Sequence, residues 1–508
     1  MHLDVPGAHP VALPARRGAM SKTIDTYDEL YSISDLHIGG VAGQQLFDQR
    51  ASDAMSWLCD HIVAKAATQD VGLVINGDVF DFLAEDNAVY CEGSAIVTKL
   101  DAIARRPEYA QVLAAWQRVL SHPRARLVFV IGNHDIELAL PWAQKWLHDH
   151  LIKDNGARFI LAADGTGYDA IVGGRRVYFV HGNEADEWNW VDHEGLRRVN
   201  AAVKRRGPLP GVQTNQGTRL VVDLMNKVKV RYPFVDQLKP ERGPVVSLLL
   251  ALDDRNLQFL PSLAGNLFSA AIDGVKQRLG LLSTDDEAGQ FDMTVAESIE
   301  LVKVRTGYVH ANDSQTGEAV LWRTEEHFQS GKSVRRNTGA DGELLGGETT
   351  LGDTFRPLLK PALRLFLRQT PQTFDLLGAD DIGDRLMSTV GFDVDFLVAG
   401  HTHLRRAKPR GQGVYFNSGT WAKLMRIDAA AVDTKGFEEF VSAIENEHVP
   451  DRQNKLTQFT RFEPTVVVIR REDDKVVGYL ATVLESAPHF DLVTLPGSAH
   501  KVDARGPQ

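Results

Sequence analysis

One pattern, repeated five times, constrains this chain most: a short apolar run ends in a polar tip that carries Asp, His or Asn. The tips read SDLHIGG, INGDVFDF, IGNHDIE, FVHGN and VAGHTH. Continuous apolar runs of this length are typical of strands that are buried on both faces. Open α/β sheets place their ligands beyond the carboxyl ends of the strands. We therefore expect an α/β fold in which the five tips converge on one crevice.

The length of 508 residues implies more than one folding unit, because single cores stop growing at roughly 250–300 residues. The strand-and-tip pattern stops between residues 201 and 385, where apolar stretches at helical spacing follow a basic, Pro/Gly-rich segment. We expect a large, mainly helical insertion there, forming a cap subdomain. The predicted divisions are an extended N-terminal segment (1–24), a discontinuous catalytic domain (25–200 and 386–485), the inserted subdomain (201–385) and a C-terminal tail (486–508).

Charge and composition argue against several classes of protein. The formal net charge is −11, which disfavours a nucleic-acid binder, because those proteins usually carry a basic surface. Two cysteines do not make a disulfide scaffold, and we expect a cytoplasmic location. No apolar run approaches the roughly 18–20 residues of a spanning helix. We also expect no secretory signal in residues 1–19, while peripheral membrane contact stays open.

The side chains at the tips are those that bind divalent metal ions. Imidazole suits iron, manganese, zinc or nickel, and carboxylates suit harder ions. Two ions about 3.5–4 Å apart can hold a phosphoryl group and activate a water between them. In DLH and HTH the outer two residues point the same way on an extended tip, so both can face one ion. The five tips thus offer these candidate ligands: Asp35, His37, Asp78, Asp81, Asn133, His134, Asp135, His181, His401 and His403.

The order D-x-H, GD, GNHD, H, GHTH resembles the calcineurin-like metallophosphoesterases over about 25–200 and 386–485. The resemblance implies a four-layer αββα sandwich with the site at its rim. It implies two divalent metal ions, with Mn²⁺ expected first and iron, zinc or nickel as alternatives. One ion would be held by Asp35, His37, Asp78 and His403, and the other by Asp78, Asn133, His181 and His401.

The resemblance also implies roles for the residues after Asn133. His134 would act as an acid or stabilise the phosphoryl transition state, and Asp135 would orient His134. The expected reaction is hydrolysis of a phosphoester by a metal-bridging hydroxide. Arg405 and Arg406 follow GHTH directly and are candidate substrate-binding residues, since an arginine can bind a second phosphate bidentately. The alternative for both is a solvated loop charge.

The substrate is less constrained. GDVFDF and YFNSGTW resemble the UDP-2,3-diacylglucosamine pyrophosphatases, which cleave a pyrophosphate in lipid A synthesis. The chain departs from that branch in having GNHD in place of GNRD, and about 220 residues between His181 and His401. We expect a phosphodiesterase or pyrophosphatase that acts on a small-molecule or lipid-linked substrate. The alternatives are a nuclease and a non-catalytic, metal-dependent scaffold.

Three polar residues stand close behind His181, namely Asn183, Asp186 and Glu187. Metal-binding histidines are commonly supported by an outer carboxylate or carbonyl. One of these three residues is therefore a candidate for such a supporting role. The insertion begins soon afterwards, so we expect it to emerge at the rim of the site and to influence specificity.

Overall fold

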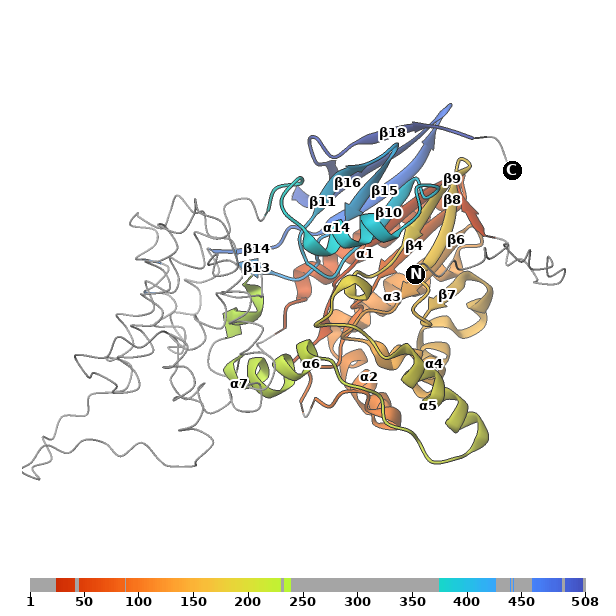
Figure 1. Cartoon of the computed structure of the whole chain (residues 1–508). Coiled ribbons are helices and arrows are strands. Elements are labelled where there is room, and N and C mark those ends of the chain that lie inside the picture. Colours follow the sequence, from red (N-terminus) through yellow and green to blue (C-terminus); the bar gives the residue numbers. More distant parts are fainter. Residues whose placement is uncertain are drawn as a thin grey trace, which may run out of the picture.

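Figure 1 shows the computed structural model, which describes residues 24–41, 45–86, 88–229, 233–238, 374–425, 439, 442, 459–486 and 489–505. Two β-sheets lie face to face, and helices cover their outer faces. The order of the layers is a group of helices, the larger sheet, the smaller sheet and a further helix. The expected four-layer αββα sandwich is therefore confirmed.

The larger sheet has the strand order β17-β16-β15-β2-β4-β6-β7, and β18 also pairs with β16. Its parallel half contains β2 (Glu29–Ile33), β4 (Val71–Asn76), β6 (Ala125–Val130) and β7 (Phe159–Ala162). Its antiparallel half contains β15 (Thr465–Glu472), β16 (Lys475–Ser486), β17 (His489–Thr494) and β18 (His500–Asp503). All residues of β2 and β4 are buried, as the apolar runs predict.

The smaller sheet has the order β1-β8-β9-β10-β12-β11. Its strands are β1 (Asp25–Tyr27), β8 (Tyr168–Val172), β9 (Arg175–Phe179), β10 (Phe396–Ala399), β11 (Arg406–Arg410) and β12 (Gly413–Asn417). Strand β10 is parallel to both β9 and β12. Strand β10, which follows the predicted insertion in the sequence, therefore pairs with β9, which precedes it. This pairing joins the two parts of the smaller sheet.

Four helices cover the outer face of the larger sheet: α1 (Gln49–Ala66), α2 (Ile96–Ala104), α3 (Pro107–Ser121) and α4 (Pro141–Leu147). Helix α1 begins where the Asp48 carboxylate accepts a hydrogen bond from the Ala51 amide. Met55, Leu58 and Ile62 of α1 recur at helical spacing and belong to the core beneath these helices.

Helix α14 (Asp381–Thr389) covers the smaller sheet (Figure 1). Its residues Ile382 and Leu386 belong to one buried cluster with Leu397 and Tyr415 of that sheet. Between the two sheets lies a second core, to which the strands contribute alternate side chains such as Val74, Val128, Phe179, Val398 and Phe416.

The remaining elements are short or flank the sandwich. They are β3 (Ile38–Gly39) with β5 (Phe80–Asp81), β13 (Leu424–Met425) with β14 (Thr460–Arg461), and helices α5 (His193–Arg205), α6 (Gln216–Leu220) and α7 (Asn226–Lys229). None of the helices in the described ranges has the length and apolar character needed to cross a bilayer.

The structure adds detail to one predicted division and leaves another open. The segment predicted as a tail contains β17 and β18, which both pair with the long strand β16. Their side chains are mostly exposed or half-buried, so they lack the apolar signal of the inner strands. Most of the predicted helical insertion, residues 239–373, and the N-terminal residues 1–23 lie outside the described residues. Helix α14, although it begins within the predicted 201–385, packs on the sandwich.

Candidate metal centre

The predicted ligands follow strands of both sheets. Asp35 and His37 come after β2, Asp78 after β4, and Asn133 after β6 of the larger sheet. His181 comes after β9, and His401 and His403 after β10, of the smaller sheet. The structure brings six of these seven residues into two groups whose potential ligand atoms lie within 4.8 Å of one another: Asp35, His37 and His403 in one, and Asp78, His181 and His401 in the other.

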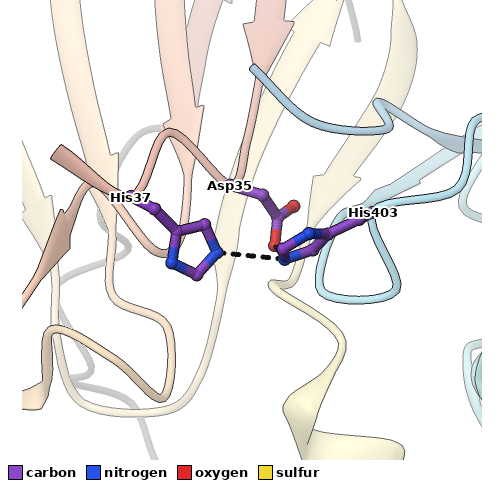
Figure 2. Close-up of side chains that lie close together, drawn as sticks. All are labelled: Asp35, His37 and His403. Carbon is purple, nitrogen blue, oxygen red and sulfur yellow. Dashed lines mark hydrogen bonds and ion pairs between the residues drawn. The ribbon is translucent and has the colours of Figure 1, made fainter. Parts of the chain in front are cut away.

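The first group is buried and its side chains converge, as Figure 2 shows. His37 Nε2 lies 3.0 Å from His403 Nε2. His403 Nε2 also lies 3.3 Å from Asp35 Oδ1. Two imidazoles and a carboxylate that face one point in this way are a suitable donor set for a divalent transition metal.

Asp78 belongs to the second group and also lies close to His37 of the first. Its Oδ2 atom is 3.2 Å from His181 Nε2 and 3.8 Å from His37 Nε2. Its Oδ1 atom accepts a hydrogen bond of 2.9 Å from the His134 amide. This is the position that a carboxylate shared by two ions requires.

Asn133 provides a further observation that fits a cation. Its side chain is 4% exposed, and its Oδ1 atom is buried and forms no hydrogen bond with any described residue. An unsatisfied buried carbonyl oxygen is costly, so native structures usually give it a partner. A metal ion bound to Oδ1 would satisfy it, and the donor set as a whole suits two divalent ions.

The charges of the buried groups depend on one another. Burial alone would raise the pKa of Asp35, but the imidazoles of His403 and His181 outweigh it and lower that pKa to about 2. In the same way His181, His134 and His37 hold the pKa of Asp78 well below its usual range. Burial would lower the pKa of His181, but Asp78 and Asp35 raise it to about 10. Carboxylates buried this deeply need nearby positive charge, which metal ions also supply.

The backbone at the ligands is unusual. Five of the nine described non-glycine residues with positive φ are predicted ligands: Asp35 (52°), His37 (50°), Asp78 (51°), His401 (69°) and His403 (59°). Such conformations are costly for residues with a Cβ atom and gather at functional sites. Here neighbouring backbone holds them, since the amides of Asp35 and His37 donate to the carbonyls of Gly77 and Asp78.

Two glycines permit the close packing of these side chains. A Cβ atom on Gly77 would lie 2.1 Å from His181 Nδ1, and one on Gly132 would lie 2.1 Å from Asp78 Oδ1. Neither position has room for a side chain. The glycines of the GD and GNHD tips are therefore part of how the site is built.

Hydrogen bonds at Nδ1 orient two of the histidines. His37 Nδ1 lies 3.0 Å from Asp81 Oδ2, and His181 Nδ1 lies 2.8 Å from the Asn76 carbonyl oxygen. With Nδ1 engaged, the Nε2 atom of each ring faces the centre. This arrangement is typical of metal-binding histidines, since the outer partner fixes both the tautomer and the ring orientation.

The carboxylate beside His134 is that of Asp81, and this corrects the role expected of Asp135. Asp81 Oδ1 lies 3.0 Å from His134 Nδ1. The Asp135 oxygens instead accept hydrogen bonds from the amides of Gly132 and Val79, both at 2.7 Å. Burial and the charge of Asp78 raise the pKa of Asp135 to about 7. Asp135 thus fixes the loop that carries Asn133.

Sequence reasoning missed the role of Asp81, although a signal for it was present. Asp81 stands three residues after Asp78 in GDVFDF and lies on β5, which pairs with β3 directly after His37. That pairing brings one carboxylate within reach of both His37 and His134.

The structure separates the two candidate arginines. Arg406 is 1% exposed, and its guanidinium donates to the carbonyls of Asp375, Ala379 and Arg405 at 2.9–3.1 Å. The expectation that Arg406 contacts substrate is therefore corrected, because its donors hold chain segments together. Arg405 forms an ion pair of 3.0 Å with Glu463 and lines, with His403, a pocket beside the first ligand group.

Comparison with known proteins agrees with this architecture. Residues 30–232 match the family of calcineurin-like phosphoesterases, which leaves His401 and His403 outside the matched range. No curated protein matches the chain. Among solved structures, a Vps29 single mutant from Entamoeba histolytica is 15% identical with a TM-score of 0.13. That match covers 25% of this chain and 52% of the other, so it adds no argument.

The family match over residues 30–232 and the sheet topology therefore lead to the same conclusion: this chain has the calcineurin-like phosphoesterase fold.

Proposed function

We propose that this protein hydrolyses phosphoesters, as a phosphodiesterase or pyrophosphatase for a small-molecule or lipid-linked substrate. The observation that carries the proposal is the position of Asp78 in one group of potential ligands and close to His37 of the other, with His134 next to them. Two divalent ions, Mn²⁺ first among them, would supply an activated water and offset the charge of the phosphoryl group.

The residues of the chain divide into holding and reacting groups. Asp35, His37 and His403 would hold one ion, and Asn133, His181 and His401 the other, with Asp78 shared. His134 is the reacting group that we propose, because its side chain is 17% exposed at the edge of the buried centre. Asp81 contacts Nδ1 and so orients the ring, which leaves Nε2 as the nitrogen that would pass a proton to the leaving oxygen.

The pocket beside His403 supports a substrate with more than one charged group. Arg405 and Arg461 line it, as do apolar side chains such as Leu424 and Phe374. A guanidinium next to the centre suits a second phosphate, and an apolar wall suits a carbon-rich leaving group. The net charge of −11 favours such substrates over nucleic acid.

We also propose a cytoplasmic location.

Hydrolysis of bis(p-nitrophenyl) phosphate tests the proposal. Metal-free protein should be inactive, added Mn²⁺ should restore turnover, and Asp78→Ala should remove it. Asp154→Ala is the matched control, since Asp154 is an exposed carboxylate outside the centre. Wild-type protein that binds Mn²⁺ but cleaves neither this diester nor a pyrophosphate would overturn the proposal in favour of a binding scaffold. Faster, salt-sensitive cleavage of single-stranded DNA would overturn it in favour of a nuclease.

A further inference from the structure

A buried carboxylate contacts the ring of His401. Asp186 Oδ2 lies 2.9 Å from His401 Nε2, and the side chains of Asp186 and His401 are 2% and 9% exposed. Asp186 directly follows the short helix η5 (Asn183–Ala185), five residues after His181. We propose that Asp186 is a positioning residue that fixes the His401 imidazole for metal binding. The inference rests on the proposed function only in taking His401 as a ligand.

The backbone of His401 is held independently of its ring. Its amide donates to both oxygens of Asp35, at 2.9 and 3.1 Å, and its φ angle is 69°. The backbone contacts do not fix the rotation of the His401 side chain about its own bonds. A carboxylate at Nε2 fixes it, because it holds the proton on that nitrogen and leaves Nδ1 as the atom that can bind a cation.

The loop that carries Asp186 is itself anchored. Asp186 Oδ1 accepts from the Trp188 amide at 3.0 Å, and Oδ2 also accepts from Asn189 Nδ2 at 2.9 Å. The Trp188 carbonyl accepts from the Gly217 amide at 2.8 Å, next to the start of α6. On the other side, Arg385 of α14 donates to the Ala185 carbonyl at 3.2 Å. The carboxylate is therefore held in place before any ion binds.

Asp186 differs in this respect from its neighbour Glu187. The Glu187 side chain is 85% exposed and lies 3.4 Å from Arg385, at the surface. Asp186 alone of this pair faces a predicted ligand. Glu187 consequently offers a matched control, as a carboxylate on the same loop that is turned to solvent.

Titration of metal-free protein with Mn²⁺ tests the inference without any substrate. Asp186→Ala should weaken one of the two Mn²⁺ sites by about 10–100-fold and leave the other unchanged. Asp186→Asn, which keeps the shape but not the charge, should weaken the same site by about 10-fold, and Asp186→Glu should recover part of the loss. At saturating Mn²⁺ the Asp186→Ala variant should regain turnover with an unchanged KM.

Two further variants separate positioning from general loop structure. Glu187→Ala should bind both ions as the wild type does. Asn189→Ala removes one of the bonds that hold the Asp186 carboxylate but leaves the carboxylate itself at His401, so it should weaken that site by less than Asp186→Ala does. Wild-type affinity in both Asp186→Ala and Asp186→Asn would overturn the inference, as would an equal loss in Asn189→Ala. Wild-type protein that binds two ions yet hydrolyses no phosphoester would defeat the proposed function alone.

Discussion

Asp81 Oδ1 lies 3.0 Å from His134 Nδ1, and the other oxygen of the same carboxylate lies 3.0 Å from His37 Nδ1. One side chain therefore orients both a predicted ligand and the proposed acid. Desolvation would raise the pKa of Asp81, but His134 and His37 hold it well below its usual range, so the group is charged at neutral pH. The geometry makes Asp81 and His134 a unit whose parts can be tested together.

Asp81→Ala should lower kcat by about 100-fold at saturating Mn²⁺, because His134 loses its orienting partner. The double variant Asp81→Ala with His134→Ala should be hardly slower than His134→Ala alone, since the two residues act as a unit. A double-mutant cycle of kcat measures this. Fully additive losses would show that Asp81 acts on turnover by another route.

His134→Ala should lower kcat by roughly 10²–10⁴-fold while both ions remain bound, because His134 is a proton donor in the proposal and no ligand. Kinetics and metal analysis of the same preparation check this. His148→Ala serves as the control, since that side chain is 67% exposed. Near-normal turnover with full metal content would remove His134 from the reaction.

Gly132→Ala should disturb the centre through Asp78, because the new Cβ would lie 2.1 Å from Asp78 Oδ1. We expect Mn²⁺ binding to weaken at both sites by at least about 10-fold, since Asp78 is shared. The control is Gly156→Ala, where a Cβ meets nothing within 4 Å. Titration calorimetry distinguishes the two variants, and equal affinities would contradict the shared position of Asp78.

Arg406→Met should lower the free energy of unfolding by about 2–4 kcal/mol, because it leaves buried carbonyls without their charged donor. Arg405→Ala should leave that free energy nearly unchanged and raise KM for a substrate with two phosphates. Urea unfolding and steady-state kinetics provide the two readouts. If Arg406→Met unfolds like the wild type, the buried guanidinium is not structural.

Glu137 gives the protein a pH dependence that is separate from the metals. Burial raises the pKa of Glu137 to about 7, from 4.5 for an ordinary glutamate, and the nearby Glu92 contributes to the rise. Between these pH values the folded protein keeps a proton that the unfolded chain releases, so stability falls as pH rises from about 4.5 to 7.

Glu137→Gln should remove this dependence. Its stability relative to the wild type should increase from pH 5 to pH 8 by up to about 3 kcal/mol. Urea unfolding of both proteins at the two pH values measures the difference. A difference that stays constant with pH would show that Glu137 ionises normally in the folded protein.

Sequence patterns predicted β4, β6 and β10 because each is a short, mainly continuous apolar run, whereas β2 (ELYSI) and β9 (RRVYF) also carry polar residues. The runs at 71–76 and 394–399 correspond to β4 and β10, and their tips meet as the α/β rule requires. Strands β11, β17 and β18 lack a continuous apolar run: β11 and β18 are mainly polar, and β17 mixes apolar and polar residues. All three lie at or near sheet edges, where burial leaves little trace in the sequence.

At the site, the sequence indicated which residues lie near the centre better than it indicated where their side chains point. Spacing alone could not show that Asp135 faces two backbone amides while Asp81 faces two imidazoles. Nor could adjacent arginines reveal that Arg406 is buried whereas Arg405 lines a pocket. Left-handed backbone at Asp78 and His403, just before Asp81 and Arg405, turns the chain in ways that neither helical nor strand periodicity describes.

The central place of β10 in the smaller sheet has a consequence for how the protein matures. The last two predicted ligands of the chain, His401 and His403, are synthesised more than two hundred residues after His181. A growing chain can form the parallel half of the larger sheet early, but neither ligand group is complete until β10 lies between β9 and β12. Tight binding of metal ions would therefore follow the synthesis and folding of β10. A chain that retains an ion would be one in which β10 has already paired with β9 and β12.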